Sequence, residues 1–172
     1  DKHFIIRISE KNGSILWNST GDPLFKRGYR THTVEAPVNE VLAAAILDLI
    51  EWDGITPLID PMCGSGTFLA EALIKSCNYA PGLNRKQFAF EKTSDFKHEL
   101  WDNLIEEAKS LKTECKAPIF GYDIDNEAIH FSTLNIENIF PNNSVKLETK
   151  DFFELEQPIE EGLLIMNPPY DV

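Results

Sequence analysis

The chain has 172 residues, 42% of them hydrophobic and 26% charged, which is the composition of a soluble globular domain with one core. Its formal net charge of −12 argues against a free-standing nucleic-acid binder, whose binding surface is normally basic, but leaves open an enzyme that acts on nucleic acid. No apolar run approaches the roughly 18 residues of a membrane-spanning helix. Three cysteines at irregular spacing predict reduced thiols in the cytoplasm, with neither a disulfide framework nor a metal site.

Residues 1–20 predict an antiparallel β-hairpin ahead of the main domain. Apolar residues alternate on both sides of an Asn12-Gly13 dipeptide, which is a strong hairpin signal. The turn-rich segment 21–36 follows, and it carries three cations and a tyrosine in the run Lys26–Arg30 (KRGYR). Two interpretations of this run stay open, a solvated loop and a phosphate contact near the mouth of an active site.

The rest of the chain alternates strand patterns with helical patterns. The predicted strands cover residues 57–60, 117–123, 145–149 and 162–166, and the predicted helices cover 37–52, 67–77, 96–111 and 126–139. Residues 78–92 predict irregular structure. Strands separated by helices favour an α/β fold with a mostly parallel sheet and helices on both faces. The continuously apolar run 162–166 predicts a central strand.

The turn Asp60–Thr67 (DPMCGSGT) joins the first of these strands to the helix after it. Gly64 and Gly66 would let the backbone approach a ligand closely, at the positive end of the helix dipole. No lysine follows Gly66, as a phosphate-binding P-loop requires, and Leu69 stands where a dinucleotide-binding turn needs its third glycine. An acid before the turn, with only two glycines, favours a cationic ligand without phosphates.

Acidic residues also follow the next two strands. Asp123 ends the second strand, where a carboxylate can accept both hydroxyls of a ribose, while Asp125 is the better candidate for the cap of the following helix. Asp151 and Phe152 follow the third strand, where an acid can bind an exocyclic amine and an aromatic ring can stack on a base. The alternative is an ordinary turn acid and a core phenylalanine. Phe153 is predicted to lie in the core.

The fourth strand runs into the sharpest motif of the chain, Asn167–Tyr170 (NPPY). Two prolines stiffen the backbone and remove N–H donors, so the Asn167 side chain and nearby carbonyls face a site as acceptors. Acceptors aimed at an amino group hold it out of conjugation with its ring, and its lone pair becomes a nucleophile. Tyr170 offers a face on which a flipped base can stack.

Ligands of open α/β sheets bind beyond the carboxyl ends of the strands, so these four strand-end features are predicted to meet in one crevice. Cys63 lies inside the glycine turn, where it is interpreted as a small packing residue and not as a nucleophile. No His, Cys or Ser partner accompanies the NPPY motif, so covalent catalysis through the protein is not implied.

The turn Asp60–Thr67 resembles the first motif of S-adenosylmethionine-dependent methyltransferases, and Asn167–Tyr170 resembles their amino-methylating motif. Two further segments are more restricted: residues 27–37, with RGYR followed by Glu35-Ala-Pro37, and residues 80–91, with Trp101 beyond them. Together they resemble the bacterial 23S rRNA guanine-N2 methyltransferases that carry a THUMP domain. The spacing from Gly66 to Asp123 is longer than a simple nucleotide-binding fold predicts, and the insertion 78–116 accounts for it.

The resemblance implies a Rossmann-like class I methyltransferase domain over residues 21–172, truncated after its fourth strand. It also implies that the hairpin of residues 1–20 leads from an RNA-binding domain outside this chain, which would supply most of the affinity for 23S rRNA. Cofactor binding is assigned to Asp60, Pro61, Cys63, Gly64, Ser65, Gly66, Thr67, Asp123, Ile124, Asp151 and Phe152. Catalysis is assigned to Asn167, Pro168, Pro169 and Tyr170.

Two rival functions stay open. The amino-methylating motif does not distinguish guanine N2 from adenine N6, so an adenine-N6 DNA methyltransferase is one alternative. A scaffold that binds the cofactor but transfers nothing is the other.

Overall fold

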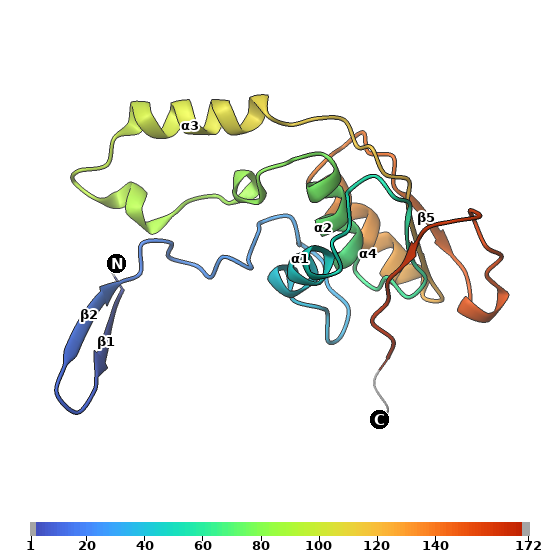
Figure 1. Ribbon diagram of the computed structural model, residues 1–172, viewed down its shortest axis with the longest axis horizontal. Coiled ribbons are helices and arrows are strands. Elements are labelled where there is room, and N and C mark those ends of the chain that lie inside the picture. The colour runs from blue at the N-terminus through green and yellow to red at the C-terminus, as the bar shows by residue number, and fades with distance from the viewer. Residues whose placement is uncertain (1–2, 170–172) are drawn as a thin grey trace.

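A computed structural model describes residues 3–169, which form two separate sheets (Figure 1). The first sheet is the predicted hairpin, in which β1 (Phe4–Ile8) pairs antiparallel with β2 (Gly13–Trp17). Every residue of both strands is exposed. The hairpin stands at the end of the molecule away from the larger sheet.

The larger sheet has four parallel strands in the order β5-β4-β3-β6, which confirms the predicted α/β class. The strands are β3 (Leu58–Asp60), β4 (Ile119–Asp123), β5 (Lys146–Thr149) and β6 (Leu163–Leu164). The chain runs outward from β3 to β5 and then returns to place β6 on the other side of β3. The order therefore reverses between β3 and β6, which is where open α/β sheets form a ligand crevice.

The fourth strand is shorter than predicted, and its central position in the complete sheet stays a prediction. Only Leu163 and Leu164 of the run 162–166 are in β6, which lies at an edge of the sheet next to β3. Leu164 is 54% exposed. A continuous apolar run predicts a strand that is covered on both faces, but it does not fix the position of that strand within the sheet.

Four α-helices occupy the predicted helical segments: α1 (Glu40–Leu49), α2 (Thr67–Ser76), α3 (His98–Ser110) and α4 (Asn126–Glu137). Helix α1 begins three residues later than Pro37. The Asn39 side chain accepts hydrogen bonds from the backbone N–H of Val41 (3.0 Å) and Leu42 (3.3 Å), and this cap fixes the start of the helix. Asp125 caps α4 in the same way, as predicted.

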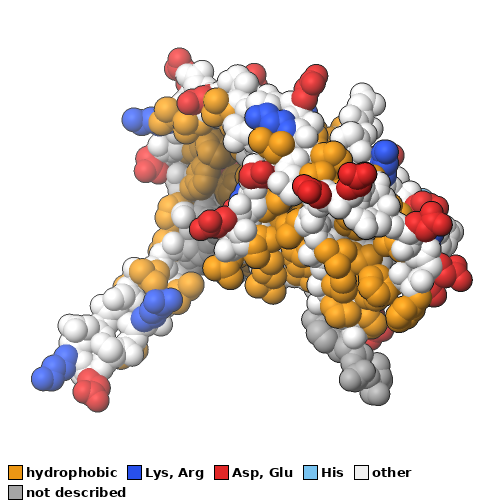
Figure 2. All heavy atoms as spheres, turned by 45° about the vertical axis from the view of Figure 1, so that its right-hand side comes forward, with side chains coloured by type: hydrophobic (Ala, Val, Ile, Leu, Met, Phe, Trp, Pro, Cys, Tyr) orange, Lys and Arg blue, Asp and Glu red, His pale blue; other side chains and the backbone are white. Residues whose placement is uncertain are grey.

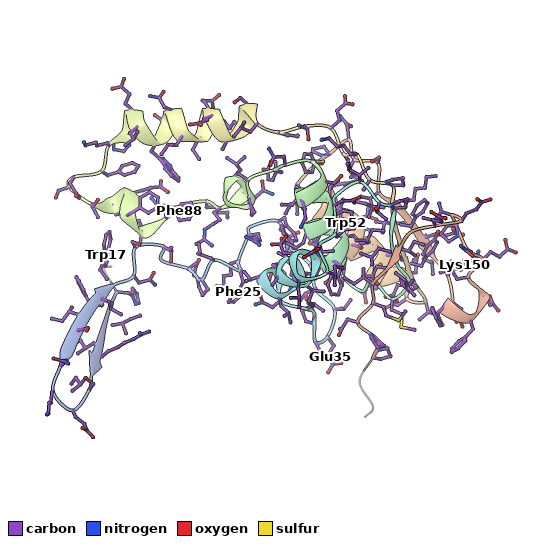
Figure 3. All side chains as sticks on the ribbon, in the orientation of Figure 1. Trp17, Phe25, Glu35, Trp52, Phe88 and Lys150 are labelled. Atoms are coloured by element: carbon purple, nitrogen blue, oxygen red, sulfur yellow. The ribbon has the colours of Figure 1, made fainter. Side chains whose placement is uncertain are left out.

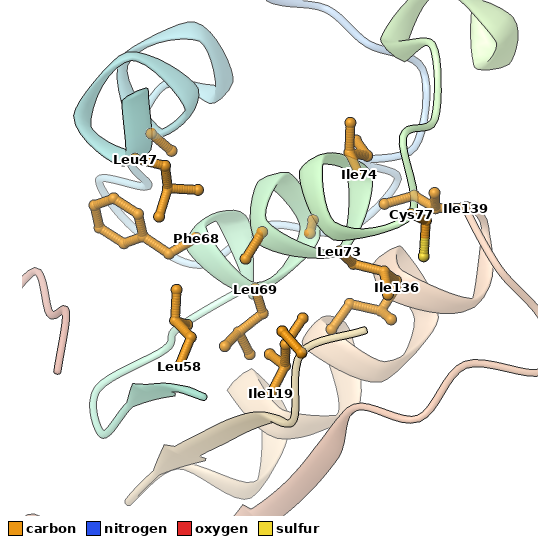
Figure 4. Packing of buried hydrophobic residues seen from close by; sticks show 14 of the residues in the cluster. Leu47, Leu58, Phe68, Leu69, Leu73, Ile74, Cys77, Ile119, Ile136 and Ile139 are labelled. Carbon is orange, nitrogen blue, oxygen red and sulfur yellow. The ribbon is translucent and has the colours of Figure 1, made fainter. Parts of the chain in front are cut away.

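The main core lies on one face of the sheet, between the sheet and helices α1, α2 and α4 (Figure 4). The opposite face is covered by the segment around Leu155 and Ile159, which packs on Ile59, Phe120 and Tyr122. The predicted second layer of helices is not seen in residues 3–169, where only the short 3-10 turn η3 (Phe152–Glu154) precedes that segment.

The insertion 78–116 contains two 3-10 turns, η1 (Pro81–Asn84) and η2 (Ala89–Lys92), followed by α3. Helix α3 has no fully buried residue, and Figure 1 shows it along the edge of the molecule. It is held by an aromatic cluster in which Phe88 and Phe90 meet Trp101 edge-on, with ring centroids 5.6 and 5.0 Å apart. None of the helices in residues 3–169 has the length and apolar character needed to cross a bilayer.

Candidate active site

A cavity of about 710 Å³ opens beyond the carboxyl ends of the larger sheet, and residues from all four predicted strand-end features line it. The sequence-predicted residues in its wall are Asp60, Pro61, Cys63, Gly64, Ser65, Thr67, Asp123, Ile124, Asp151, Phe152, Asn167, Pro168 and Pro169. Gly66 does not line the cavity, and Tyr170 lies outside the described residues. The predicted convergence on one crevice is therefore present in the fold.

Gly64 is the tightest point of the turn that follows β3. Its φ of +54° is one that side-chain-bearing residues rarely adopt. Its N–H donates to Asp123 Oδ2 at 2.8 Å, and the N–H of Cys63 donates to the carbonyl of Tyr122 at 2.9 Å. These two bonds fix the turn against the end of β4, so the ends of β3 and β4 form one rigid wall.

Gly66 has a packing role. Its φ is +79°, and a Cβ at this position would lie 2.1 Å from the Oγ of Ser132. The missing side chain therefore lets the start of α2 approach α4, and the predicted cofactor contact of Gly66 stays a prediction. Gly64 and Gly66 look equivalent in the sequence motif, because the residue that distinguishes Gly66, Ser132, lies 66 residues away in the chain.

Asp60 ends β3 and is only 1% exposed. Burial, with a smaller contribution from the charge of Asp123, raises the pKa of Asp60 from its ordinary value of 3.8 to about 7. One hydrogen bond opposes this shift, from the N–H of Met62 to Asp60 Oδ1 at 3.2 Å. A buried carboxylate that keeps its proton this tightly is stabilised in its ionised form by any cation that enters the cavity.

Asp123 is held by two backbone donors, the N–H of Gly64 on Oδ2 and the N–H of Asp125 on Oδ1 at 3.0 Å. Each carboxylate oxygen can accept more than one hydrogen bond. The side chain is thus fixed in orientation and retains acceptor capacity toward the cavity that it lines.

Asp151 and the two phenylalanines after it also line the cavity. Asp151 Oδ1 accepts from the N–H of Phe153 at 2.9 Å and caps η3, so the turn-acid interpretation holds for this oxygen. Phe152 is half-buried. The prediction that Phe153 lies in the core was wrong, because its side chain is 89% exposed at the cavity rim.

Cys63 is 7% exposed and belongs to the main core. Burial, followed by the charges of Asp60 and Asp123, raises the pKa of its thiol far above the usual range. Since the thiolate is the nucleophilic form, Cys63 is a packing residue that also contributes to the cavity wall.

Sequence reasoning missed the segment 34–38, which forms a further wall of the cavity. Figure 3 shows Glu35 at the tip of this segment, on the side where the described chain ends. Asn135 of α4, which is fully buried, anchors the preceding residues. Its Oδ1 accepts from the N–H of Thr31 (2.9 Å) and His32 (3.1 Å), and its Nδ2 donates to the carbonyls of His32 (2.8 Å) and Ser65 (3.0 Å). A single amide thus joins this wall to the glycine turn.

Two residues of the cationic run Lys26–Arg30, Arg27 and Tyr29, are neither solvated nor directed at a ligand, because both bind an internal carboxylate. Arg27 forms two hydrogen bonds to the carboxylate of Glu71, both 3.2 Å long, and Tyr29 donates to the same carboxylate at 3.0 Å. Glu71 lies on α2 and is 2% exposed. Burial raises the pKa of Glu71, and the charge of Arg27 opposes that rise. Both open interpretations were wrong for these two residues.

Arg30 is also internal. Its guanidinium donates to the carbonyl of Val38 at 2.6 Å and to Thr67 Oγ1 at 2.7 Å, and it pairs with Glu40 at 3.4 Å. Val38 and Thr67 both line the cavity. Arg30 therefore supports the cavity from behind without entering it.

The charge of the cavity is one-sided. Glu35, Asp60, Asp123 and Asp151 line it, and no Lys, Arg or His of the described chain does. In residues 3–169 no group of three or more His, Cys, Asp and Glu side chains is placed to hold a metal ion. The cavity therefore suits a cationic organic ligand and disfavours phosphate.

Fold and cavity together define the class. A parallel sheet with a glycine turn after β3, an acid after β4 and a crevice where the strand order reverses is a nucleoside-binding α/β domain. Comparison with known proteins gives the family. Residues 27–172 match the model of the RMKL-like methyltransferase domain, and the chain belongs to that family.

Individual relatives agree with this assignment. The chain is 37% identical to a ribosomal RNA large subunit methyltransferase K/L of Vibrio cholerae, over 99% of this chain and 25% of that protein. It is 38% identical to slr0064 of Synechocystis sp., a candidate RNA methyltransferase, over 95% of this chain and 43% of that protein. The solved structure of SMU.472, a candidate methyltransferase in complex with SAH, superposes with a TM-score of 0.88 at 35% identity, covering 98% of this chain and 44% of that one. The chain thus spans less than half the length of these relatives.

Proposed function

We propose that this chain is the catalytic part of an S-adenosylmethionine-dependent RNA methyltransferase, which acts in the cytoplasm on the exocyclic N2 amine of a guanine in 23S ribosomal RNA. The observation that carries the proposal is the acidic cavity that joins the glycine turn to Asn167. The name of the Vibrio cholerae relative supports the RNA substrate, and SAH in the SMU.472 structure supports the cofactor.

The residues present fit this cofactor. Its sulfonium and ammonium groups are cationic, and four carboxylates with no basic side chain line the cavity. Ser65 adds a second sign of fit, because its Oγ is buried in the cavity wall without a hydrogen-bond partner. We assign the methionine part to Asp60, Gly64 and Ser65, the ribose to Asp123, and the adenine to Asp151 and Phe152.

When bound, the cofactor supplies an electrophilic methyl group. The protein positions the amine that attacks it and excludes water from the site. We assign amine positioning to the side-chain oxygen of Asn167 and the carbonyl of Pro168. Two acceptors hold the amine's hydrogens and leave its lone pair directed at the methyl group. The methylated amine is cationic, and it then releases one proton to solvent. Cys63, which lines the cavity, is held as a thiol and is not assigned a role as covalent nucleophile.

Glu35 supports guanine over adenine. It lines the same cavity as Asn167. Guanine presents two adjacent donors, N1–H and the N2 amine, which a carboxylate can accept together, whereas adenine presents an acceptor at N1 that a carboxylate repels. The alternative, adenine N6 of DNA, draws support from the name of a 30% identical structure from Listeria monocytogenes, a predicted N6-adenine-specific DNA methylase.

The test uses the full protein with methyl-labelled cofactor, unmodified 23S rRNA and DNA, followed by nucleoside analysis. Label on guanine N2 of the RNA is expected. Asn167→Ala is expected to reduce transfer at least about 100-fold while cofactor affinity changes less than about 3-fold. Glu35→Gln is expected to raise KM for RNA roughly 10-fold, because one charge-assisted acceptor is lost. Label on adenine of DNA alone would refute the proposal, and wild type as inactive as Asn167→Ala with intact cofactor binding would establish a silent scaffold.

A further inference from the structure

A second cavity, of about 840 Å³, lies outside the site described above, between the hairpin end of the molecule and the insertion. Residues 20–30 form one wall and residues 84–92 form the other. In Figure 2 the surface is hollowed above the hairpin. We call this cavity the basic hollow, because its lining includes Lys26, Arg30, Arg85, Lys86 and Lys92 and only two acids, Asp22 and Glu40.

The charge of the hollow is exceptional for this chain. Acids outnumber Lys and Arg by 28 to 16 in the sequence, yet cations outnumber acids in the hollow. Two of the cations are engaged internally, Arg30 with Glu40 and Arg85 with backbone carbonyls. Lys26 makes only an exposed contact with Asp22 at 3.4 Å, which water screens. The side chains of Lys86 and Lys92 are exposed and form no hydrogen bond or ion pair within residues 3–169.

The hollow is preformed, because its two walls are joined at three points. The N–H of Phe90 donates to the carbonyl of Ser19 at 2.9 Å. The Arg85 guanidinium crosses between the walls and donates to the carbonyls of Asp22 (2.9 Å), Pro23 (2.8 Å) and Lys26 (2.8 Å). Gly28 lets the walls meet, since a Cβ there would lie 2.2 Å from the carbonyl oxygen of Asn84.

Aromatic rings accompany the charges. Phe25 is 37% exposed and Phe88 is half-buried, with the Arg85 guanidinium 4.8 Å from its ring centroid. Figure 3 shows Phe25 and Phe88 on the two facing walls. The Phe88 ring already stacks on Phe90, with centroids 5.1 Å apart, so Phe25 is the ring that offers a face to a base. A cationic groove with an exposed aromatic ring suits a single nucleic-acid strand, because lysines contact phosphates and a base stacks on the ring.

Arg30 connects the hollow to the active site. It lines the basic hollow, and its guanidinium bonds to Val38 and Thr67, which line the acidic cavity. Arg30 thus links two cavities that carry opposite charge.

We infer that the basic hollow binds the single-stranded backbone of the substrate RNA next to the nucleotide that enters the acidic cavity. The inference rests on the proposed RNA substrate. Phosphate ligands are excluded from the acidic cavity by its four carboxylates, so the flanking phosphates need a cationic surface nearby. The hollow supplies one without requiring a basic net charge.

The test measures binding of the full protein to a single-stranded fragment of 23S rRNA as a function of salt. The double variant Lys86→Gln/Lys92→Gln is expected to weaken binding on the order of 10-fold at 0.1 M salt. It is also expected to reduce the slope of log K against log salt by about 1.4, which is about 0.7 for each lost phosphate contact. The matched control Lys109→Gln/Lys116→Gln removes the same charge from exposed positions outside the hollow and should change neither quantity.

Phe25→Leu separates stacking from charge. It is expected to weaken RNA binding about 5-fold or more with an unchanged salt slope. A salt slope unaltered by Lys86→Gln/Lys92→Gln, or altered equally by the control pair, overturns the inference, whether or not the RNA is methylated. If the RNA binds with the expected salt slopes but is not methylated, the inference about the basic hollow is supported and the proposed function is refuted.

Discussion

Replacing Asp60 by Asn is expected to stabilise the cofactor-free protein above neutral pH. The side chain is 1% exposed, and its pKa is about 7 against an ordinary 3.8. Because the folded state holds this proton more tightly than the unfolded chain, raising the pH from about 4 to 7 lowers the free energy of unfolding. The separation of the two pKa values, at about 1.4 kcal/mol per pH unit, corresponds to about 4 kcal/mol once both states are ionised.

Asn keeps the shape of Asp60 and can still accept the hydrogen bond from Met62, but it carries no charge to desolvate. For a chain of this length about 4 kcal/mol corresponds to a rise in Tm of roughly 8 to 16 °C at pH 8. The rise should shrink as the pH falls and approach zero below about pH 4, where Asp60 becomes protonated in the unfolded chain as well. Thermal unfolding of both proteins from pH 4 to 8, without cofactor, measures it.

Asp53→Asn is the control of opposite sign. Asp53 is exposed, and hydrogen bonds from the backbone N–H groups of Thr56 (2.7 Å) and Ile55 (2.8 Å) lower its pKa. The stability that Asp53 contributes is present above its unfolded pKa and is lost as pH falls through the lower folded value. Its replacement should therefore reduce Tm at pH 8. An Asp60→Asn protein no more stable than wild type at pH 8, or equally stabilised at pH 4 and 8, would contradict the burial argument.

Two further outcomes are expected. Gly66→Ala should destabilise the fold by roughly 2 to 4 kcal/mol, because Ala combines a positive φ with a clash against Ser132. Gly64→Ala meets only Val34 Cγ2 at 3.3 Å and should cost about half as much. Denaturant titration compares the two variants, and equal losses would contradict the packing role of Gly66. Alkylation at pH 7.5, read by mass spectrometry, should modify half-buried Cys115 first, because a hydrogen bond from the Cys77 thiol lowers the pKa of Cys115 to about 6. Faster labelling of Cys63 would overturn the assignment of Cys63 as a protonated core thiol.

The strand-end features were predictable because each depends on local sequence. An apolar run followed by Asp60 or Asp123 fixes both the strand and the residue at its carboxyl end, and parallel strands bring those ends to one edge. The hairpin is predictable for the same reason, from its alternating apolar residues, although its turn is Glu10-Lys11 between the paired Ser9 and Asn12, and Gly13 already belongs to β2. Knowledge of the fold class was therefore enough to predict that these strand-end residues meet in one cavity.

The errors concern residues whose role depends on distant partners. Arg27 reaches Glu71 across 44 residues of chain, and Glu71 sits in a helix where a lone acid appears solvent-facing from sequence. Asn135 joins segments 103 and 70 residues away in the chain, and its helical position gives no sign of this. Phe153 is an exception, because its partner is local: hydrophobicity predicts a core position, yet its N–H bonds to Asp151 two residues earlier and its side chain is exposed.

The placement of Arg30 has a consequence for how the two cavities work together. Its charge is neutralised by Glu40 at 3.4 Å, so it contributes little attraction to either ligand. Its bonds to Val38 and Thr67 instead join the wall 34–38 to the end of the glycine turn. A cation bound in the acidic cavity and an anionic RNA strand bound in the basic hollow would attract each other across the residues that separate the two cavities. The acidic net charge of the chain is then compatible with an RNA substrate, because the cationic ligand binds in the acidic cavity and the anionic strand binds in the basic hollow.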